Sequence, residues 1–421
     1  MLDILFGLIG LTTLLAIALA FSENRRAVDW RLVATGLGLQ LVFAVFVLLT
    51  PWGAAVFGFL SQGFVNLLGY TQEGSRFIFG ELVNVDNIGF VFAFQVLPTI
   101  IFFASFMAVL YHLGVMQVIV RGMAWVITKV MRVSGAETLS VCANAFIGQT
   151  EAPLVVKPYI LGMTRSELLT LMVGGMATIA GGVLGAYVML LGGSDPEVQR
   201  FYAQHLIAAS IMAAPATLVI AKVLCPETGE PLTRGHVRVE VEKTTANLID
   251  AAASGAGEGL RLALNVGAML LAFIALVALL NGPIGWLGEV TGLSEMLGQP
   301  LSLSLVLGYI VAPIAWLIGV PGPDIVAVGG LIGTKVVLNE FVAYVQLAEI
   351  QEGLTDKGRL IATYALCGFA NISSIAIQIG GIGGLAPERR ADLARFGLKA
   401  VLGGSLATLM TANIAGVLGS F

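Results

Sequence analysis

Polar side chains that could bind a small ligand stand in two short stretches between apolar segments. Gln149, Thr150 and Glu151 place an amide, a hydroxyl and a carboxylate in consecutive positions, and Asn339 and Glu340 place an amide beside a carboxylate. These groups donate and accept hydrogen bonds. A glutamate within a membrane segment is a functional residue by default, because a charge there is costly. The two stretches therefore predict recognition of a polar molecule, although the two glutamates could also act as an acid–base pair.

The composition places these stretches in a membrane protein. Of the 421 residues, 57% are hydrophobic and 11% are charged, and the mean hydropathy is +0.92. An ordinary soluble domain has about 25% charged residues. A net charge of −4 without a long basic run indicates no nucleic-acid binding, and three widely spaced cysteines fit neither a disulfide framework nor a zinc cluster. We therefore predict an all-α polytopic membrane protein.

Eight charge-poor runs are long enough to cross the membrane, since a helix needs about 20 apolar residues for about 30 Å of hydrocarbon. They are residues 2–21, 32–50, 89–111, 168–193, 201–221, 262–280, 360–387 and 400–421. The apolar runs 54–68 and 115–131 are short or interrupted, which predicts helices along the membrane surface. The run 301–320 is long enough to span, but its prolines favour an interfacial or re-entrant segment unless 324–346 crosses back.

Basic residues set the orientation, because short cytoplasmic loops retain lysine and arginine. They gather after every second span: Arg25, Arg26, Arg31, Arg121, Lys129, Arg132, Lys222, Arg234, Arg238, Lys243, Arg389, Arg390 and Arg395. The N-terminus is therefore predicted outside. Short loops and few charges favour a bacterial inner membrane.

The first polar stretch has the features of a helical hairpin. Gly148 loosens the backbone, and Pro153 suits the first turn of a new helix because its missing N–H would have no helical partner there. The apolar segments on either side are each too short to span.

The two halves of the chain repeat one pattern. Glu151 is followed by Gly175-Met-Ala-Thr-Ile-Ala180, and Glu340 by Gly368-Phe-Ala-Asn-Ile-Ser373. Two membrane crossings separate these two spans. The positions of the basic loops predict that the two spans cross the membrane in opposite directions. Paired interrupted segments in an inverted repeat indicate a midplane binding site of a secondary transporter.

Three motifs in this order resemble the concentrative nucleoside transporter family: Gly148-Gln-Thr-Glu-Ala-Pro153, Asn339-Glu-Phe-Val-Ala-Tyr344 and Cys367-Gly-Phe-Ala-Asn-Ile-Ser-Ser374. The resemblance covers nearly the whole chain. It implies eight transmembrane helices, two re-entrant hairpins at about 136–159 and 324–347, interfacial helices, and a homotrimer. It also implies scaffold regions at 1–135 and 223–323, and repeats at 136–222 and 324–421 that form a transport domain moving like an elevator.

The resemblance assigns roles to the polar residues. Gln149, Thr150 and Glu151 are expected to contact the base of a uridine-, cytidine- or adenosine-type nucleoside. Glu340, Asn371 and Ser374 are expected to contact the ribose. Val183 and Phe369 are expected to pack around the base and the sugar. Three structural alternatives remain open. Glu151 and Glu340 could form ion pairs with Lys157 and Lys335, and Val183 and Phe369 could simply be packing residues. Small polar residues could make hydrogen bonds between helices: Asn371, Ser373 and Ser374.

The driving force is predicted to be an ion gradient, since no phosphate-binding loop for ATP occurs. By resemblance, a coupling sodium ion is bound by the side chains of Asn144 and Thr178 and the carbonyls of Ile147 and Ile179. Thr178 departs from the serine of sodium-coupled bacterial relatives but keeps the hydroxyl oxygen. Thr150 stands where proton-coupled members tend to have serine, so sodium symport is the prediction and proton symport the alternative. No other cofactor is expected.

Two other classes compete with this interpretation. A membrane-embedded enzyme would use the glutamates catalytically, but no catalytic motif is present and the glutamates occupy equivalent places in a repeat. A passive channel would differ from a transporter in that its uptake would not be concentrative.

Overall fold

The computed structural model describes residues 2–234 and 245–419, and over this range the chain is helical apart from turns and one isolated bridge between Ser134 and Arg234. The predicted loop residues Arg238 and Lys243, and the end of the last predicted span at 420–421, lie outside it. Seven helical segments within the described residues are long and apolar enough to cross a membrane: Asp3–Ala20, Trp30–Leu49, Phe92–His112, Arg165–Gly192, Pro196–Leu224, Leu248–Val290 and Pro387–Leu418.

The remaining predicted span, 360–387, is a broken helix. It consists of α18 (Asp356–Leu366) and α19 (Ile372–Leu385), separated by residues 367–371. The corresponding span of the first repeat is also broken, into α10 (Arg165–Ala177) and α11 (Gly181–Gly192). Broken helices therefore occupy equivalent places in the two repeats, as the sequence pattern predicts.

The two predicted hairpins are formed. The first consists of α8 (Gly135–Ile147), a tip at 148–151, and an irregular second arm made of η3 (Ala152–Val156) and α9 (Lys157–Ile160). The second consists of α16 (Ile325–Val337) and α17 (Glu340–Ile350), with α15 (Leu303–Leu317) packed antiparallel to α16. Glycine permits this packing, because a Cβ at Gly308 would lie 2.5 Å from the Val326 carbonyl oxygen.

Two helices are much longer than the predicted apolar runs. The run 54–68 lies within α3 (Pro51–Phe79), which begins at a Thr50 cap. The run 262–280 lies within α13 (Leu248–Val290), whose 43 residues are about 65 Å long at 1.5 Å per residue. Charged residues end an apolar run in the sequence, but they do not end the backbone hydrogen bonding of a helix. Both runs were therefore shorter than the helices that contain them.

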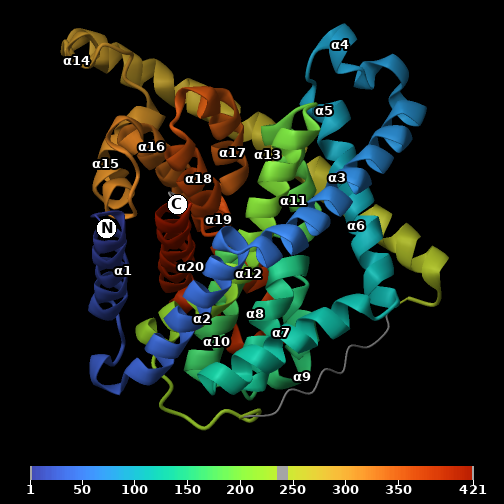
Figure 1. The fold of residues 1–421 in the computed structure, drawn as a ribbon, viewed down its shortest axis with the longest axis vertical. Helices are drawn as coiled ribbons and strands as arrows, with labels where there is room; N and C mark the ends of the chain where they lie inside the picture. The colour runs from blue at the N-terminus through green and yellow to red at the C-terminus, as the bar shows by residue number, and fades with distance from the viewer. Residues whose placement is uncertain (1, 235–244, 420–421) are drawn as a thin grey trace.

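The remaining helices are α1 (Leu2–Ala20), α2 (Trp30–Leu49), α4 (Val85–Ile88), α5 (Phe92–Gln95), α6 (Leu97–His112), α7 (Val115–Met131), α12 (Pro196–Leu224), α14 (Leu293–Leu297) and α20 (Arg390–Leu418). Figure 1 shows α8, α10, α12 and α20 at the centre of the bundle, with α3 and α7 running across it. The central helices are almost entirely buried, whereas α13 exposes most of its apolar side chains.

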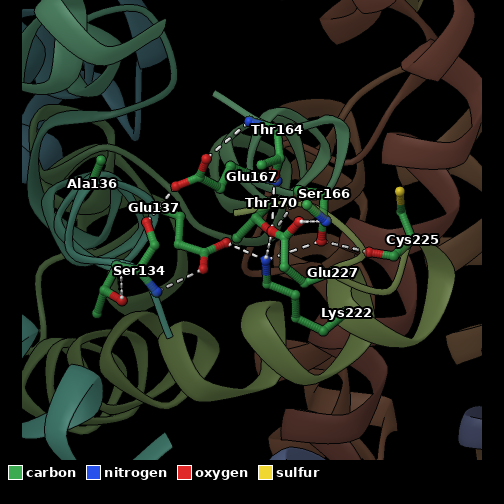
Figure 2. Close-up of polar contacts among 12 residues, drawn as sticks. Ser134, Ala136, Glu137, Thr164, Ser166, Glu167, Thr170, Lys222, Cys225 and Glu227 are labelled. Atoms are coloured by element: carbon green, nitrogen blue, oxygen red, sulfur yellow. Dashed lines mark hydrogen bonds and ion pairs between the residues drawn. The ribbon is translucent and has the colours of Figure 1, made fainter. Parts of the chain in front are cut away.

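A buried ionic cluster fixes the start of the first hairpin (Figure 2). Lys222 of α12 is 5% exposed, and its Nζ lies 2.7 Å from Glu137 of α8 and 3.2 Å from Glu227. The same Nζ donates a hydrogen bond to Ser166 Oγ at the start of α10. Removing one partner of a buried ion pair costs about 3–5 kcal/mol. The cluster therefore holds α8, α10 and α12 together and gives the hairpin tip a rigid base.

Candidate functional site

The tip of the first hairpin packs against the break in the first broken helix. Gly148 ends α8 with φ at +88°, a conformation that favours glycine. A Cβ at this position would lie 2.8 Å from the Cβ of Ala180, which belongs to the break between α10 and α11. The two breaks also meet, because Phe369 N donates a hydrogen bond to the Thr178 carbonyl at 3.3 Å. The structure thus brings the hairpin tip and both breaks into one place.

The three consecutive polar residues of the tip have different surroundings. Gln149 is 8% exposed and faces the second repeat, where its Nε2 donates to Ser374 Oγ at 3.2 Å. Thr150 and Glu151 are exposed, and Thr150 Oγ1 donates to Glu151 Oε1 at 2.9 Å. Within the described residues Glu151 has no ion pair, so the alternative pair with Lys157 is not formed.

Glu340 lies at the first position of α17, where the positive end of the helix dipole stabilises a carboxylate. It is 6% exposed and accepts hydrogen bonds from Tyr187 Oη at 3.0 Å and from Asn371 Nδ2 at 3.1 Å. Lys335 instead donates to the Ala365 carbonyl at 2.7 Å and to Thr408 Oγ1 at 2.9 Å, so the alternative Glu340–Lys335 pair is not formed.

Asn371 connects the carboxylate to the first hairpin. As the N-cap of α19 it accepts hydrogen bonds through Oδ1 from Ser374 N at 2.8 Å and from Ser373 Oγ at 2.7 Å, while its amide nitrogen donates to Glu340. A continuous chain of contacts therefore runs from Gln149 through Ser374 and Asn371 to Glu340. It joins predicted base-contact and ribose-contact residues from the two repeats.

The two predicted apolar site residues lie at the two breaks. Val183 of α11 is 4% exposed, and Phe369 lies partly buried in the second break. Tyr187 was not predicted as a site residue; it follows Val183 by one helical turn, and its hydroxyl donates a hydrogen bond to Glu340. Its ring stacks on Tyr344 with centroids 4.3 Å apart. The available signal was a phenol in an otherwise apolar helix, four positions after a predicted site residue.

The predicted sodium ligands gather behind the hairpin tip. Asn144 is fully buried, and its Nδ2 donates to the Ser140 carbonyl at 3.1 Å, whereas its Oδ1 has no hydrogen-bond partner in the described chain. Thr178 Oγ1 lies 3.1 Å from the Asn144 carbonyl oxygen. Ile147 ends α8 and Ile179 lies in the break, so continuing helices do not use their carbonyls. A buried oxygen without a partner, on a residue whose main chain contacts the Thr178 hydroxyl, has the chemistry that an alkali cation needs.

Comparison with known families identifies the chain. Models for the N-terminus and the C-terminus of Na+ dependent nucleoside transporters match residues 9–82 and 205–416, and a nucleoside recognition model matches residues 93–194. The chain belongs to the sodium-dependent nucleoside transporter family. This confirms the resemblance drawn from the three motifs. Because the family consists of transporters, the acid–base enzyme is excluded.

Individual relatives of the family are similar over nearly the whole chain. The uncharacterized transporter YutK of Bacillus subtilis is 46% identical over 416 residues, covering 99% of each protein. Sodium/nucleoside cotransporter 1 of Mus musculus is 42% identical over 425 residues, which are 97% of this chain and 63% of the mouse protein.

Solved structures of the transporter CNTnw share the fold. An inward-facing substrate-bound state has a TM-score of 0.89 at 44% identity, covering 99% of this chain and 98% of that one. A substituted form in an outward-facing state has a TM-score of 0.91 at 43% identity, covering 100% and 98%. The helical architecture with broken helices is therefore that of this transporter family.

Proposed function

We propose that this transporter imports nucleosides by symport with sodium ions. The observation that carries the proposal is the hydrogen-bonded chain from Gln149 to Glu340, in which both repeats supply polar groups to one place. An amide, hydroxyls and carboxylates so arranged match a molecule with a base edge at one end and sugar hydroxyls at the other.

The base lies against Gln149, Thr150 and Glu151, with Val183 beside it. The ribose lies against Glu340, Asn371 and Ser374, with Phe369 beside it. Each oxygen of Glu340 already accepts one hydrogen bond from the protein and keeps capacity for a ribose hydroxyl. Bonds to an ionised carboxylate are roughly twice as strong as neutral ones, which offsets part of the cost of removing water from both partners.

Sodium is bound by Asn144 Oδ1, Thr178 Oγ1 and the carbonyls of Ile147 and Ile179. The first and third of these oxygens belong to the hairpin, and the other two belong to the broken helix. An ion between them therefore draws the tip towards the break and positions Gln149 and Glu151 for the nucleoside. Binding of the two solutes is then mutually favourable by one common factor.

Transport follows from movement of the two repeats, 136–222 and 324–421, past a scaffold of 1–135 and 223–323. The packing of α13 along α6 supports a separate scaffold pair, since a Cβ at Gly259 would lie 2.8 Å from the Cβ of Ala104. The protein is assembled as a homotrimer in a bacterial inner membrane, with its N-terminus outside. Its long, exposed apolar α13 is suited to contacts with lipid and with neighbouring protomers.

Equilibrium binding to the purified protein tests the proposed coupling. Uridine should bind more tightly in sodium chloride than in potassium chloride at equal ionic strength, and saturating uridine should tighten sodium binding by the same factor. Identical uridine affinity in the two salts would contradict the sodium site. Tightening by acid in place of sodium would indicate the proton-coupled alternative.

A further inference from the structure

Gln378 is a buried amide behind the predicted base contact. It lies on α19 one helical turn after Ser374 and is 1% exposed. Its Nε2 donates to the Met172 carbonyl of α10 at 2.9 Å and to Gln149 Oε1 at 3.1 Å. Gly175 leaves room for this contact, because a Cβ there would lie 2.6 Å from Gln378 Nε2 and 2.8 Å from Gln149 Cβ.

These partners determine which way both amides point. A backbone carbonyl only accepts hydrogen bonds, so Gln378 must turn its nitrogen, and not its oxygen, towards Met172. Because the same nitrogen also faces Gln149, Gln149 must present its oxygen to Gln378. The nitrogen of Gln149 is thereby directed to Ser374. The orientation of Gln149 is thus set by a fixed main-chain group two contacts away.

We propose that Gln378 is a positioning residue that fixes the side-chain amide of Gln149 and so sets the affinity for the nucleobase. This role rests on the proposed function, in which Gln149 contacts the base. A base edge offers donors and acceptors at defined positions, so an amide free to turn over presents the wrong group for part of the time. An orientation that is populated only in part lowers the apparent affinity by that fraction.

The test is a double-mutant cycle on the dissociation constant for uridine, measured in saturating sodium. Gln378→Met removes both hydrogen bonds at nearly unchanged volume. It should weaken uridine binding roughly fivefold, which corresponds to Gln149 holding its base-binding orientation about one fifth of the time. Half-saturation by sodium, measured separately without uridine, should stay unchanged. In a Gln149→Ala background the same substitution should have no further effect, since Gln378 acts through Gln149. Gln378→Asn, which keeps an amide but is too short for both contacts, should behave like Gln378→Met and serves if the methionine variant does not fold.

Gln40→Met is the matched control. Gln40 is also a fully buried glutamine, and its Nε2 donates to Thr411 Oγ1 of α20 at 3.0 Å. Among the described residues, no hydrogen bond joins it to Gln149, Ser374, Asn371 or Glu340. Its substitution should leave uridine affinity unchanged. Equal losses from Gln378→Met with and without Gln149, or unchanged uridine affinity in Gln378→Met, would overturn the positioning role alone. Failure of the unsubstituted protein to bind any nucleoside would overturn the proposed function, and this role with it.

Discussion

Glu340→Gln is expected to lower the ratio of maximal uptake rate to KM for uridine roughly a hundredfold, or about 3 kcal/mol, the scale of a lost charge-assisted hydrogen-bond set. Both carboxylate oxygens accept hydrogen bonds from the protein, from Tyr187 and from Asn371. An amide at this position can keep the hydrogen bond from Asn371 through its oxygen, but its nitrogen then faces Tyr187, whose hydroxyl has to accept where it now donates. The substitution therefore reverses one hydrogen bond of the site in addition to removing the charge that we propose binds the ribose. Uptake into proteoliposomes measures the effect.

Glu349→Gln makes the same chemical change on the same helix as a control. Glu349 lies near the other end of α17 and is exposed. The Glu349→Gln variant should transport uridine like the unsubstituted protein. Normal uptake by Glu340→Gln, with unchanged KM, would remove Glu340 from the nucleoside site.

Asn144→Ala is expected to raise the sodium concentration for half-maximal uptake roughly tenfold or more, since one of the proposed ligand oxygens of the ion is lost. The buried Oδ1 of Asn144 has no other partner among the described residues, so its removal breaks no hydrogen bond made by that oxygen. Uridine affinity should recover at saturating sodium. The measurement is the initial rate of uridine uptake as a function of sodium concentration.

Asn413→Ala provides the comparison. Asn413 of α20 is likewise fully buried, and neither its Oδ1 nor its Nδ2 has a hydrogen-bond partner in the described part of the chain. It lies against Gly7 and Gly10 of α1, away from the hairpin tip. The sodium dependence of this variant should be unchanged. If both alanine variants alter sodium dependence equally, Asn144 has no specific place in the ion site.

The fold followed from sequence wherever one physical constraint dominated. Membrane thickness sets the length of an apolar span, so hydropathy located the spans well. The repeated glycine motif located the two helix breaks. Close packing at the breaks explains why glycine is needed there. A Cβ at Gly368 would lie 2.9 Å from the Met176 carbonyl oxygen of the other broken helix, and one at Gly175 would displace Gln149 and Gln378. Small residues at both places let the breaks and the hairpin tip approach.

Two site residues and two helix lengths were not predicted from the sequence. The residues at the hairpin tip and breaks were predicted and are brought together. Tyr187 and Gln378 were missed although each is a polar side chain in an apolar helix, because neither belongs to the motifs at the tip or the breaks. Their roles depend on partners far along the chain, Glu340 and Gln149. The lengths of α3 and α13 were underestimated for a different reason: hydropathy detects the membrane, whereas a helix continues through charged residues at its surface.

Uptake of labelled uridine into proteoliposomes under an inward sodium gradient tests the central claim most directly. Potassium in place of sodium and an imposed proton gradient are the parallel conditions. We predict accumulation above the external concentration only with sodium, and collapse of that accumulation when the sodium gradient is dissipated. Equilibration without accumulation would indicate a passive channel, and accumulation driven equally well by protons without sodium would contradict sodium symport.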